Sequence, residues 1–378
     1  MKRHRLFKIY LILMTLLICH DSWAQETKLS KSIDKTFKVS DRVNIEITNK
    51  YGNVIIDTWS RNEVSLKIEI LAFGKDESAA DKLMDRVEFD FKHSDDFLEV
   101  ESVFDRKKSF FKDLVNAVGD YSASLLSKHK LQINYELSIP ASTSSISVDN
   151  KFGDVHIGEV EGRVNVTIAH GNLRVSKLVD YSRLSMNYGI AKIHEINEAN
   201  ISLKGAELEV EYVGKLNLNS SSSTVTVGKA GSIDLESTND NIKIVEVHDI
   251  SGSANFTEMS ISYLSEICRL DQSYGGMTIK NIPGDFKSVR LSGKSTDYKL
   301  RFSNDASFET RIYARDDKLS IKEFPGLREK RYMDDKSKFV QVTGNFGKST
   351  TESKLNIDAQ NGEVSIEFID ILPETYNK

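Results

Sequence analysis

The sequence predicts an all-β fold, and in particular a parallel β-solenoid with coils of roughly 17–18 residues. Short segments that alternate apolar and outward-facing residues recur between residues 153 and 300, at steps of 18, 18, 17, 17, 17, 17, 18 and 21. A solenoid must close each coil over the previous one, so its coil length is nearly fixed, whereas a hairpin meander tolerates variable loops. Val, Ile and Thr are frequent and the chain has only 4 Pro, which favours strands. A β-sandwich is the main alternative.

These steps place aliphatic residues in columns. One column reads Ile157, Val175, Ile193, Val210, Val227, Ile244, Ile261, Ile279 and Leu300. A further column, three residues along, reads Val160, Leu178, Ile196, Val213, Ala230, Val247, Leu264 and Ile282. A second alternating strand, for example Val164 and Val166, lies between successive segments. Neither strand could bury its apolar face alone, so we expect neighbouring coils to stack.

The segment 1–24 has the pattern of a secretory signal peptide. Four basic residues lie among the first eight, an apolar run extends from Ile9 to Cys19, and cleavage is expected after Ala24. The apolar run is too short for a transmembrane helix, which needs ~20 residues. The sequence therefore predicts an exported protein that is periplasmic, secreted or on the outer surface.

The remaining chain is expected to have three parts. Residues 25–139 form an N-terminal β region with one or two helices, the first at Asp76–Val87 and the second in an apolar stripe at 108–128. Residues 140–322 form the solenoid repeat. Residues 323–378 form a charged, irregular loop, placed at 323–335, and capping strands at 339–342, 355–357 and 364–368.

One motif occurs in nearly the same form at both ends of the repeat. Asn49–Ile56 matches Asn150–Ile157 almost position for position, Asn361–Ile366 repeats its core, and Tyr135–Pro140 precedes the second copy. The glycine of the motif suits a corner with positive φ. The aromatic residues beside that glycine, Tyr51, Phe152, Tyr188 and Tyr274, are expected to cap the core.

With these motifs and the signal peptide, the chain resembles the exported "putative adhesin" β-strand-repeat family of Gram-negative bacteria, a family of domains of unknown function. The resemblance covers most of residues 40–370. It implies a single-domain β-solenoid without known catalytic residues. The apolar stripe at 108–128 and the charged loop at 323–338 depart from the family pattern, which leaves room for a specialised role.

Composition and charge exclude some classes of function. The 378 residues are 39% hydrophobic and 28% charged, as expected for a folded protein. Removing the signal peptide takes the net charge from −5 to about −8, which gives no general attraction to nucleic acid. Cys268 is then the one remaining cysteine, so no intramolecular disulfide can form. The mature chain has no apolar run long enough for a transmembrane helix.

The sequence predicts no catalytic, cofactor-binding or metal site, and hence no enzyme. Its histidines after the signal peptide are not at metal-ligand spacing. The Gly-Lys-Ser runs at 293–295 and 347–349 lack the earlier glycine of a phosphate loop. The Ser220–Thr224 run is interpreted as a corner with stacked hydroxyls, and Asp240 as a turn residue.

One outward column is the candidate binding face. Its proposed site residues are His156, Arg174, Lys192, Glu209, Lys243 and Lys299, with Thr226, Ser260 and Thr278 between them. This polar, weakly basic face could bind an anionic polysaccharide or a protein, although an ordinary solvated face has the same composition. The stripe at 108–128, with lysines beside it, could associate peripherally with a membrane surface or cover a sheet edge.

The leading functional hypothesis is a non-enzymatic envelope or surface protein that binds a glycan or protein partner in an adhesin-like way. The first alternative is a periplasmic structural or signalling accessory protein whose end caps contact another protein. The second is a polysaccharide-active enzyme, which would need carboxylates gathered in one groove. The mixed Lys, Thr, Ser and Glu of the outward columns count against that enzyme.

Overall fold

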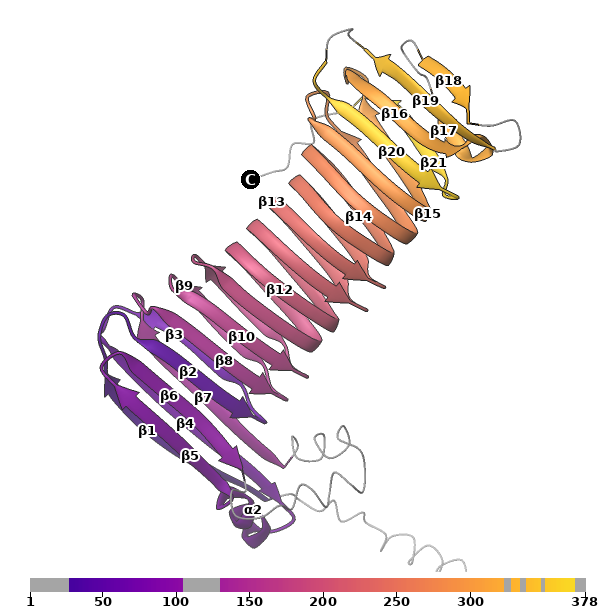
Figure 1. The fold of residues 1–378 in the computed structure, drawn as a ribbon. Helices are drawn as coiled ribbons and strands as arrows, with labels where there is room; N and C mark the ends of the chain where they lie inside the picture. Colours follow the sequence, from indigo (N-terminus) through magenta and orange to yellow (C-terminus); the bar gives the residue numbers. More distant parts are fainter. Residues whose placement is uncertain (1–26, 105–129, 323–327, 334–337, 348–350, 371–378) are drawn as a thin grey trace, which may run out of the picture. The chain divides into compact units, whose positions relative to one another are not determined.

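The computed structural model describes residues 27–104, 130–322, 328–333, 338–347 and 351–370 (Figure 1). Within them the chain is all-β with one large mixed sheet, which confirms the predicted class. Among these residues, α2 (Glu77–Met84) is the one α-helix, and η1 (Asp316–Lys318) is a short 3₁₀ turn. No helix in the described part is long and apolar enough to cross a membrane. The predicted signal peptide and the stripe at 108–128 lie outside the described residues.

The strands follow one another closely along the chain. They are β1 (Thr27–Lys38), β2 (Asn44–Lys50), β3 (Val54–Trp59), β4 (Glu63–Gly74), β5 (Val87–Ser94), β6 (Phe97–Phe104), β7 (Leu131–Pro140), β8 (Ser145–Lys151), β9 (Val155–Val160), β10 (Arg163–Ala169), β11 (Leu173–Leu178), β12 (Ser182–Ser221), β13 (Thr224–Thr238), β14 (Asn241–Ile282), β15 (Ser288–Ser303), β16 (Phe308–Arg315), β17 (Leu319–Ile321), β18 (Arg328–Tyr332), β19 (Phe339–Phe346), β20 (Lys354–Gln360) and β21 (Val364–Ile369).

The described chain divides into two compact units, and the smaller one contains α2. This unit has residues 27–32, 69–88, 103–104 and 130–132, and the rest of the described chain forms the larger unit. Asp76 caps α2 by accepting a hydrogen bond from the Ala79 amide at 2.8 Å. The helix ends at Met84, earlier than predicted, and Val87 already begins β5. The Val-Glu-Phe-Asp-Phe sequence of β5 favours an extended backbone over another helical turn.

In the larger unit, the strands of the repeat pair in parallel at the steps predicted from the sequence. Val175 of β11 pairs with Ile193 of β12, 18 positions further along the chain. Val227 of β13 pairs with Val210 of β12 and Ile244 of β14, each 17 positions away. Every residue of the predicted column from Ile157 to Leu300 is at most 3% exposed. The aliphatic columns are therefore the core of this unit.

The three copies of the motif lie against the repeat itself. Asn49 pairs with Asn150 and Val54 with Val155, so β2 and β3 pair with β8 and β9. On their other side β2 and β3 pair with β6 and β7. At the other end, β20 pairs with both β15 and β16, and β21 pairs with both β15 and β17. The first and last copies of the motif thus occupy internal positions in the pairing order, although they are remote in sequence.

The corner at this motif corrects the interpretation of its glycine at Gly52 and Gly153, whereas Gly189 and Gly275 have the positive φ that was expected, 124° and 138°. The left-handed backbone belongs to the preceding residue, with φ of 70° at Tyr51 and 60° at Phe152. The same conformation recurs once in successive repeats, at Tyr51, Phe152, His170, Tyr188, Gly205, Ser222, Asn239, Phe256, Tyr274, Ser295 and Asn361. Gly153 is required for a different reason, because a Cβ there would overlap the carbonyl oxygen of Gly52 in the neighbouring corner, between β2 and β3.

The aromatic residues of this corner stack on one another. The rings of Phe152 and His170 stack at 5.2 Å, and those of His170 and Tyr188 at 5.0 Å. Tyr51 is buried, as a residue that caps the core would be, but Tyr188 is 50% exposed and Tyr274 is 43% exposed. The expectation that all four aromatic residues cap the core is therefore wrong for Tyr188 and Tyr274.

Buried polar side chains tie the corner to the interior. The Asn150 amide donates to the carbonyls of Gly52 and Gly153 at 3.0 and 2.9 Å, which bridges two neighbouring corners. Further along, buried Asp240 accepts hydrogen bonds from the hydroxyls of Ser220 and Ser237, both at 2.6 Å. The predicted stacking of hydroxyls at this corner is thus present, but it is organised around a carboxylate. Satisfied polar networks of this kind specify the register of a core.

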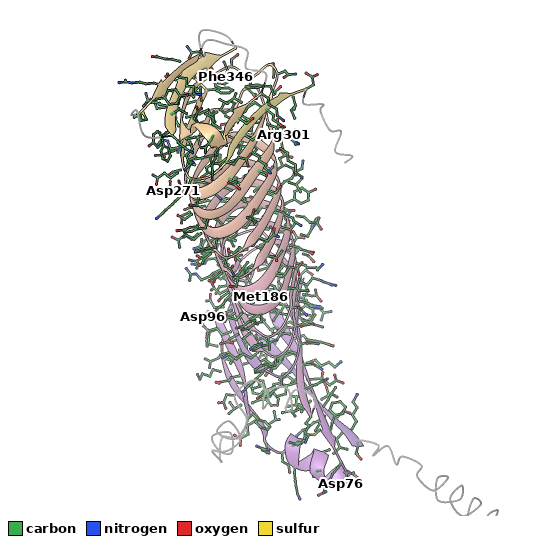
Figure 2. All side chains as sticks on the ribbon, turned by 90° about the vertical axis from the view of Figure 1, so that its right-hand side faces the viewer. Asp76, Asp96, Met186, Asp271, Arg301 and Phe346 are labelled. Atoms are coloured by element: carbon green, nitrogen blue, oxygen red, sulfur yellow. The ribbon has the colours of Figure 1, made fainter. Side chains whose placement is uncertain are left out.

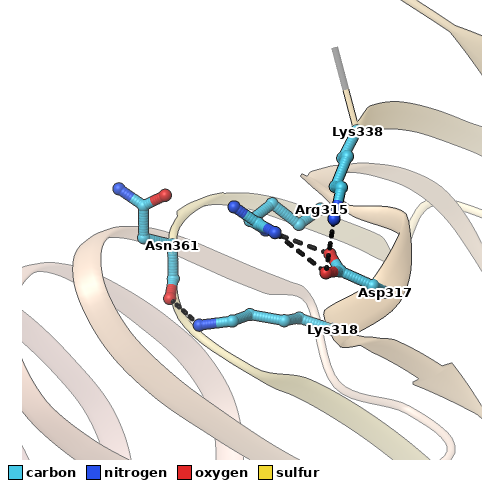
Figure 3. Close-up of polar contacts among 5 residues, drawn as sticks. All are labelled: Arg315, Asp317, Lys318, Lys338 and Asn361. Carbon is cyan, nitrogen blue, oxygen red and sulfur yellow. Dashed lines mark hydrogen bonds and ion pairs between the residues drawn. The ribbon is translucent and has the colours of Figure 1, made fainter. Parts of the chain in front are cut away.

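The C-terminal part contains a strand where an irregular loop was expected. Residues Arg328–Tyr332 form β18, which pairs antiparallel with β19. The turn η1 contains Asp317. Arg315, the residue before η1, donates to both carboxylate oxygens of Asp317 at 3.0 and 2.8 Å (Figure 3). The Arg315 hydrogen bonds lower the pKa of Asp317 to about 2. Lys318 donates to the carbonyl oxygen of Asn361 at 2.6 Å, so η1 is tied to the corner of the last motif copy.

Candidate binding groove

The outer surface of the larger unit is covered by polar side chains, including the exposed Asp271 and Arg301 (Figure 2). One outward column runs directly before the buried column that contains Leu178, Ile196 and Val213. It reads Glu159, Lys177, Glu195, Tyr212, Lys229 and Glu246. Lys177 pairs with Glu159 and Glu195 on its two neighbouring strands, and Lys229 pairs with Tyr212 and Glu246.

Oppositely charged neighbours in this column form ion pairs. Lys177 lies 3.1 Å from Glu195, and Lys229 lies 3.2 Å from Glu246. Such exposed pairs add little stability, but they cancel much of the charge that each side chain would present. Tyr212 interrupts this alternation with a large ring that is 47% exposed. A surface position that pairs with Lys229 therefore carries an aromatic residue instead of an acid.

Around Tyr212 the surface is hollowed into a groove of about 730 Å³, which we call the Tyr212 groove. It crosses β11, β12 and β13 and the corner that follows β11. Val179, 40% exposed, adds a second apolar side chain, and the His194 ring contacts the Tyr212 ring edge-on at 5.8 Å. Its lining residues are Lys177, Leu178, Val179, His194, Glu195, Ile196, Asn197, Tyr212, Val213, Gly214, Lys229, Ala230 and Gly231.

Two glycines open the groove. A Cβ on Gly214 would lie 2.5 Å from the carbonyl oxygen of Asn197, and a Cβ on Gly231 would lie 2.5 Å from that of Gly214. The neighbouring backbone therefore excludes side chains at both positions. Ala230, the residue before Gly231, also lines the groove and has a small side chain. The ring of Tyr212 therefore stands beside open space.

A second, smaller hollow of about 460 Å³ lies over β12 and β13. Arg183, Asn200, Asn217, Asp234 and Glu236 contribute its polar lining. The amide of Asn217 donates to Asn200 at 2.7 Å, and Asn219 donates to Glu236 at 2.9 Å. These side chains thus partly satisfy one another, and this hollow has no exposed aromatic ring among its lining residues.

The structure places the six predicted site residues in one outward column, as the alternation implied. Arg174 pairs with His156 and with Lys192, and Lys299 pairs with Thr278. Lys192 forms an ion pair with Glu209 at 2.7 Å, which reduces the basic character of this face. None of the six lines either of the two hollows described above. A binding role for the column His156, Arg174, Lys192, Glu209, Lys243 and Lys299 stays a prediction.

One cluster among the described residues has potential metal ligands, namely His248, Asp249 and Glu266, whose ligand atoms lie within 4.8 Å of one another. Lys287 already binds Glu266, and His248 contacts the same carboxylate at 3.2 Å. The Lys287 hydrogen bond lowers the pKa of Glu266 below its usual range. This cluster is accounted for by its own ion pairs and carries no argument for a metal.

The outward column predicted from the sequence is a different one and contains none of the residues that line the Tyr212 groove. The signal was available in the alignment of repeats. The position before the buried column Leu178, Ile196, Val213, Ala230, Val247 and Leu264 reads Lys, Glu, Tyr, Lys, Glu and Tyr. The groove itself depends on Gly214 and Gly231, and a glycine pattern alone does not reveal a hollow.

No protein-family model and no curated protein matches the chain. Among solved structures it is similar to a putative lipid-binding protein from Parabacteroides distasonis, with 12% identity, coverage of 73% of this chain and 95% of that one, and a TM-score of 0.33. It is similar to a putative adhesin from Bacteroides fragilis, with 12% identity, coverage of 90% and 97%, and a TM-score of 0.26. It is also similar to a putative adhesin from Parabacteroides merdae, with 15% identity, coverage of 72% of this chain and 92% of that one, and a TM-score of 0.28. At these TM-scores the likenesses carry no argument about function.

Proposed function

We propose that the larger unit is a parallel β-solenoid and that the chain is an exported, non-enzymatic protein of the cell envelope or surface. Its function is to bind an extended partner molecule in the Tyr212 groove. The solenoid is supported by the nearly constant register shift between successive parallel strands. Export is supported by the charge and apolar pattern of the segment 1–24.

The observation that carries the binding role is the exposed Tyr212 in a column of ion-paired charges. An aromatic ring of which 47% is exposed leaves apolar surface in water that a ligand could cover. The ring stands over a groove crossed by several strands, so the site is held by paired backbones on both sides. A rigid hollow that combines an aromatic ring with a few polar groups is a common form of ligand site.

The composition of the groove favours binding over hydrolysis. Glycoside hydrolysis ordinarily requires two carboxyl groups, one on each side of the scissile bond. Glu195 is the one carboxylate among the described lining residues of the groove, and it is paired with Lys177. We therefore favour a binding protein over a polysaccharide-active enzyme.

Site-specific photocrosslinking on intact cells tests the proposed function. A benzophenone amino acid at position 212, in the full-length chain expressed in its native host, is expected to form a covalent adduct with an envelope component. The matched position is Lys243, an exposed residue of the column predicted from the sequence. An adduct at position 212 and none at 243 supports the proposal. Adducts at 243 alone, or at neither position, would contradict it.

A further inference from the structure

The column that contains Tyr212 repeats a set of three residues. Lys177, Glu195 and Tyr212 occupy the same position in successive repeats, and Lys229, Glu246 and Tyr263 follow in the same order in the next three repeats. Each set therefore has a lysine, a glutamate and a tyrosine, and we call the sets the first and second triads. A single exposed tyrosine could be incidental, but the recurrence of the whole set at one position of the repeat requires an explanation.

The lysine–glutamate pair has nearly the same spacing in the two triads, and of the tyrosines Tyr212 is exposed and Tyr263 is half-buried. Lysine and glutamate are ion-paired at 3.1 Å in the first and 3.2 Å in the second. The left-handed corner at Asn239 recurs at Phe256, and the same step along the sequence takes Glu246 to Tyr263. Burial, with the charges of Asp285 and Glu246, raises the pKa of Tyr263, which agrees with its position beside that glutamate. Equivalent groups of the two triads are three strand spacings apart, about 14 Å.

Such a surface suits a ligand that is itself a repeat. We infer that the two triads are equivalent subsites for one linear, uncharged glycan that lies along the column, with a sugar ring on each tyrosine. This inference rests on the proposed function, because the first triad lies in the Tyr212 groove. A pyranose ring has an apolar face that can cover an exposed aromatic ring and hydroxyl groups that hydrogen-bond to its surroundings.

The pairing of the charges favours an uncharged ligand. Each lysine is matched by a glutamate, so a charged polymer gains no net attraction from the triads. The paired ammonium and carboxylate groups keep hydrogen-bonding capacity that sugar hydroxyls can use. A peptide that adds as a strand needs a free sheet edge. The strands here have no such edge, because β11 is paired with β9 and β12, and β13 with β12 and β14.

Two equivalent subsites predict a dependence on ligand length. A trisaccharide reaches one tyrosine, whereas a hexasaccharide reaches both, so its affinity should be at least ~10-fold higher through the second contact. The probes are β-1,4-linked oligomers of glucose, xylose, mannose and N-acetylglucosamine and β-1,3-linked glucose oligomers, titrated calorimetrically into the mature chain. Tyr212→Ala and Tyr263→Ala should each remove the gain between trimer and hexamer.

Three further variants are the controls. Tyr212→Phe and Tyr263→Phe keep the rings and should keep most of the gain. Tyr188→Ala removes an exposed ring at the other corner and should leave the gain unchanged. Equal trimer and hexamer affinities, an equal loss in Tyr188→Ala, or tighter binding of hexagalacturonate than of every neutral hexamer would each overturn the inference.

The absence of binding by every oligomer would also overturn the inference. In that case a photocrosslinked adduct at position 212 that protease digests would still support the proposed function, and it would identify the partner as a protein. No adduct and no oligosaccharide binding together would remove both.

Discussion

Replacing Gly153 with alanine is expected to destabilise the larger unit by more than about 3 kcal/mol. The new Cβ would overlap the carbonyl oxygen of Gly52 in the neighbouring corner, between β2 and β3, and backbone hydrogen bonds hold that corner in place on both sides of Gly52. Relief would require the separation of two corners that also share the Asn150 hydrogen bonds to both glycine carbonyls. Equilibrium unfolding in urea, followed by circular dichroism, measures the effect.

Gly158→Ala is the matched control for Gly153→Ala. It lies five residues away, and the nearest atom to its Cβ would be Oδ1 of Asp57, the end of a flexible side chain, at 3.0 Å. We expect this variant to unfold within about 1 kcal/mol of the unmodified protein. If the two variants have the same stability, Gly153 does not lie against Gly52 as described.

Replacing Asp240 with alanine is expected to cost about 3–5 kcal/mol. Its carboxylate accepts from the Ser220 and Ser237 hydroxyls and from the backbone amides of Ser223, at 2.7 Å, and Thr238, at 3.2 Å. Asp240 is only 5% exposed, so water cannot readily replace these bonds. The midpoint of thermal unfolding should fall accordingly.

Asp234→Ala provides the comparison for Asp240→Ala. Asp234 is on the neighbouring strand β13 but exposed, with a single 3.4 Å hydrogen bond from Ser251. Its removal should leave the unfolding midpoint within experimental error. Asp240→Asn should fall between the two, because the amide keeps one acceptor oxygen and turns the other position into a donor. An unchanged midpoint for Asp240→Ala would contradict the buried network.

The sequence was most informative where one physical constraint repeats. The aliphatic column from Ile157 to Leu300 could be predicted because a core residue is needed in each strand at the same position. The partners of β2, β3, β20 and β21 in the sheet could not be predicted, because they depend on contacts between segments remote in sequence. Ile56 pairs with Ile157, 101 positions away, and only the near-identity of the two motifs hinted at this neighbourhood.

The site was less predictable than the fold for a related reason. Alternation predicts that Lys192, between Ala191 and Ile193, faces outward, but it is interrupted at Tyr212 and does not tell which outward column is hollowed. The hollow arises beside Gly214 of β12, where the carbonyl oxygen of Asn197 leaves no room for a side chain. The left-handed φ of 60° at Phe152 was likewise assigned to the following glycine, because glycine is the usual residue there.

Disulfide trapping tests the parallel register on which both the solenoid and the groove depend. Arg174 pairs with Lys192 and Lys177 pairs with Glu195, in the same strands and at the same sequence offset. Adjacent strands are ~4.8 Å apart, within the Cα range of disulfides. In this register Arg174→Cys/Lys192→Cys and Lys177→Cys/Glu195→Cys are both expected to oxidise readily. An antiparallel arrangement could align only one of these pairs, so formation of one disulfide without the other would contradict the account.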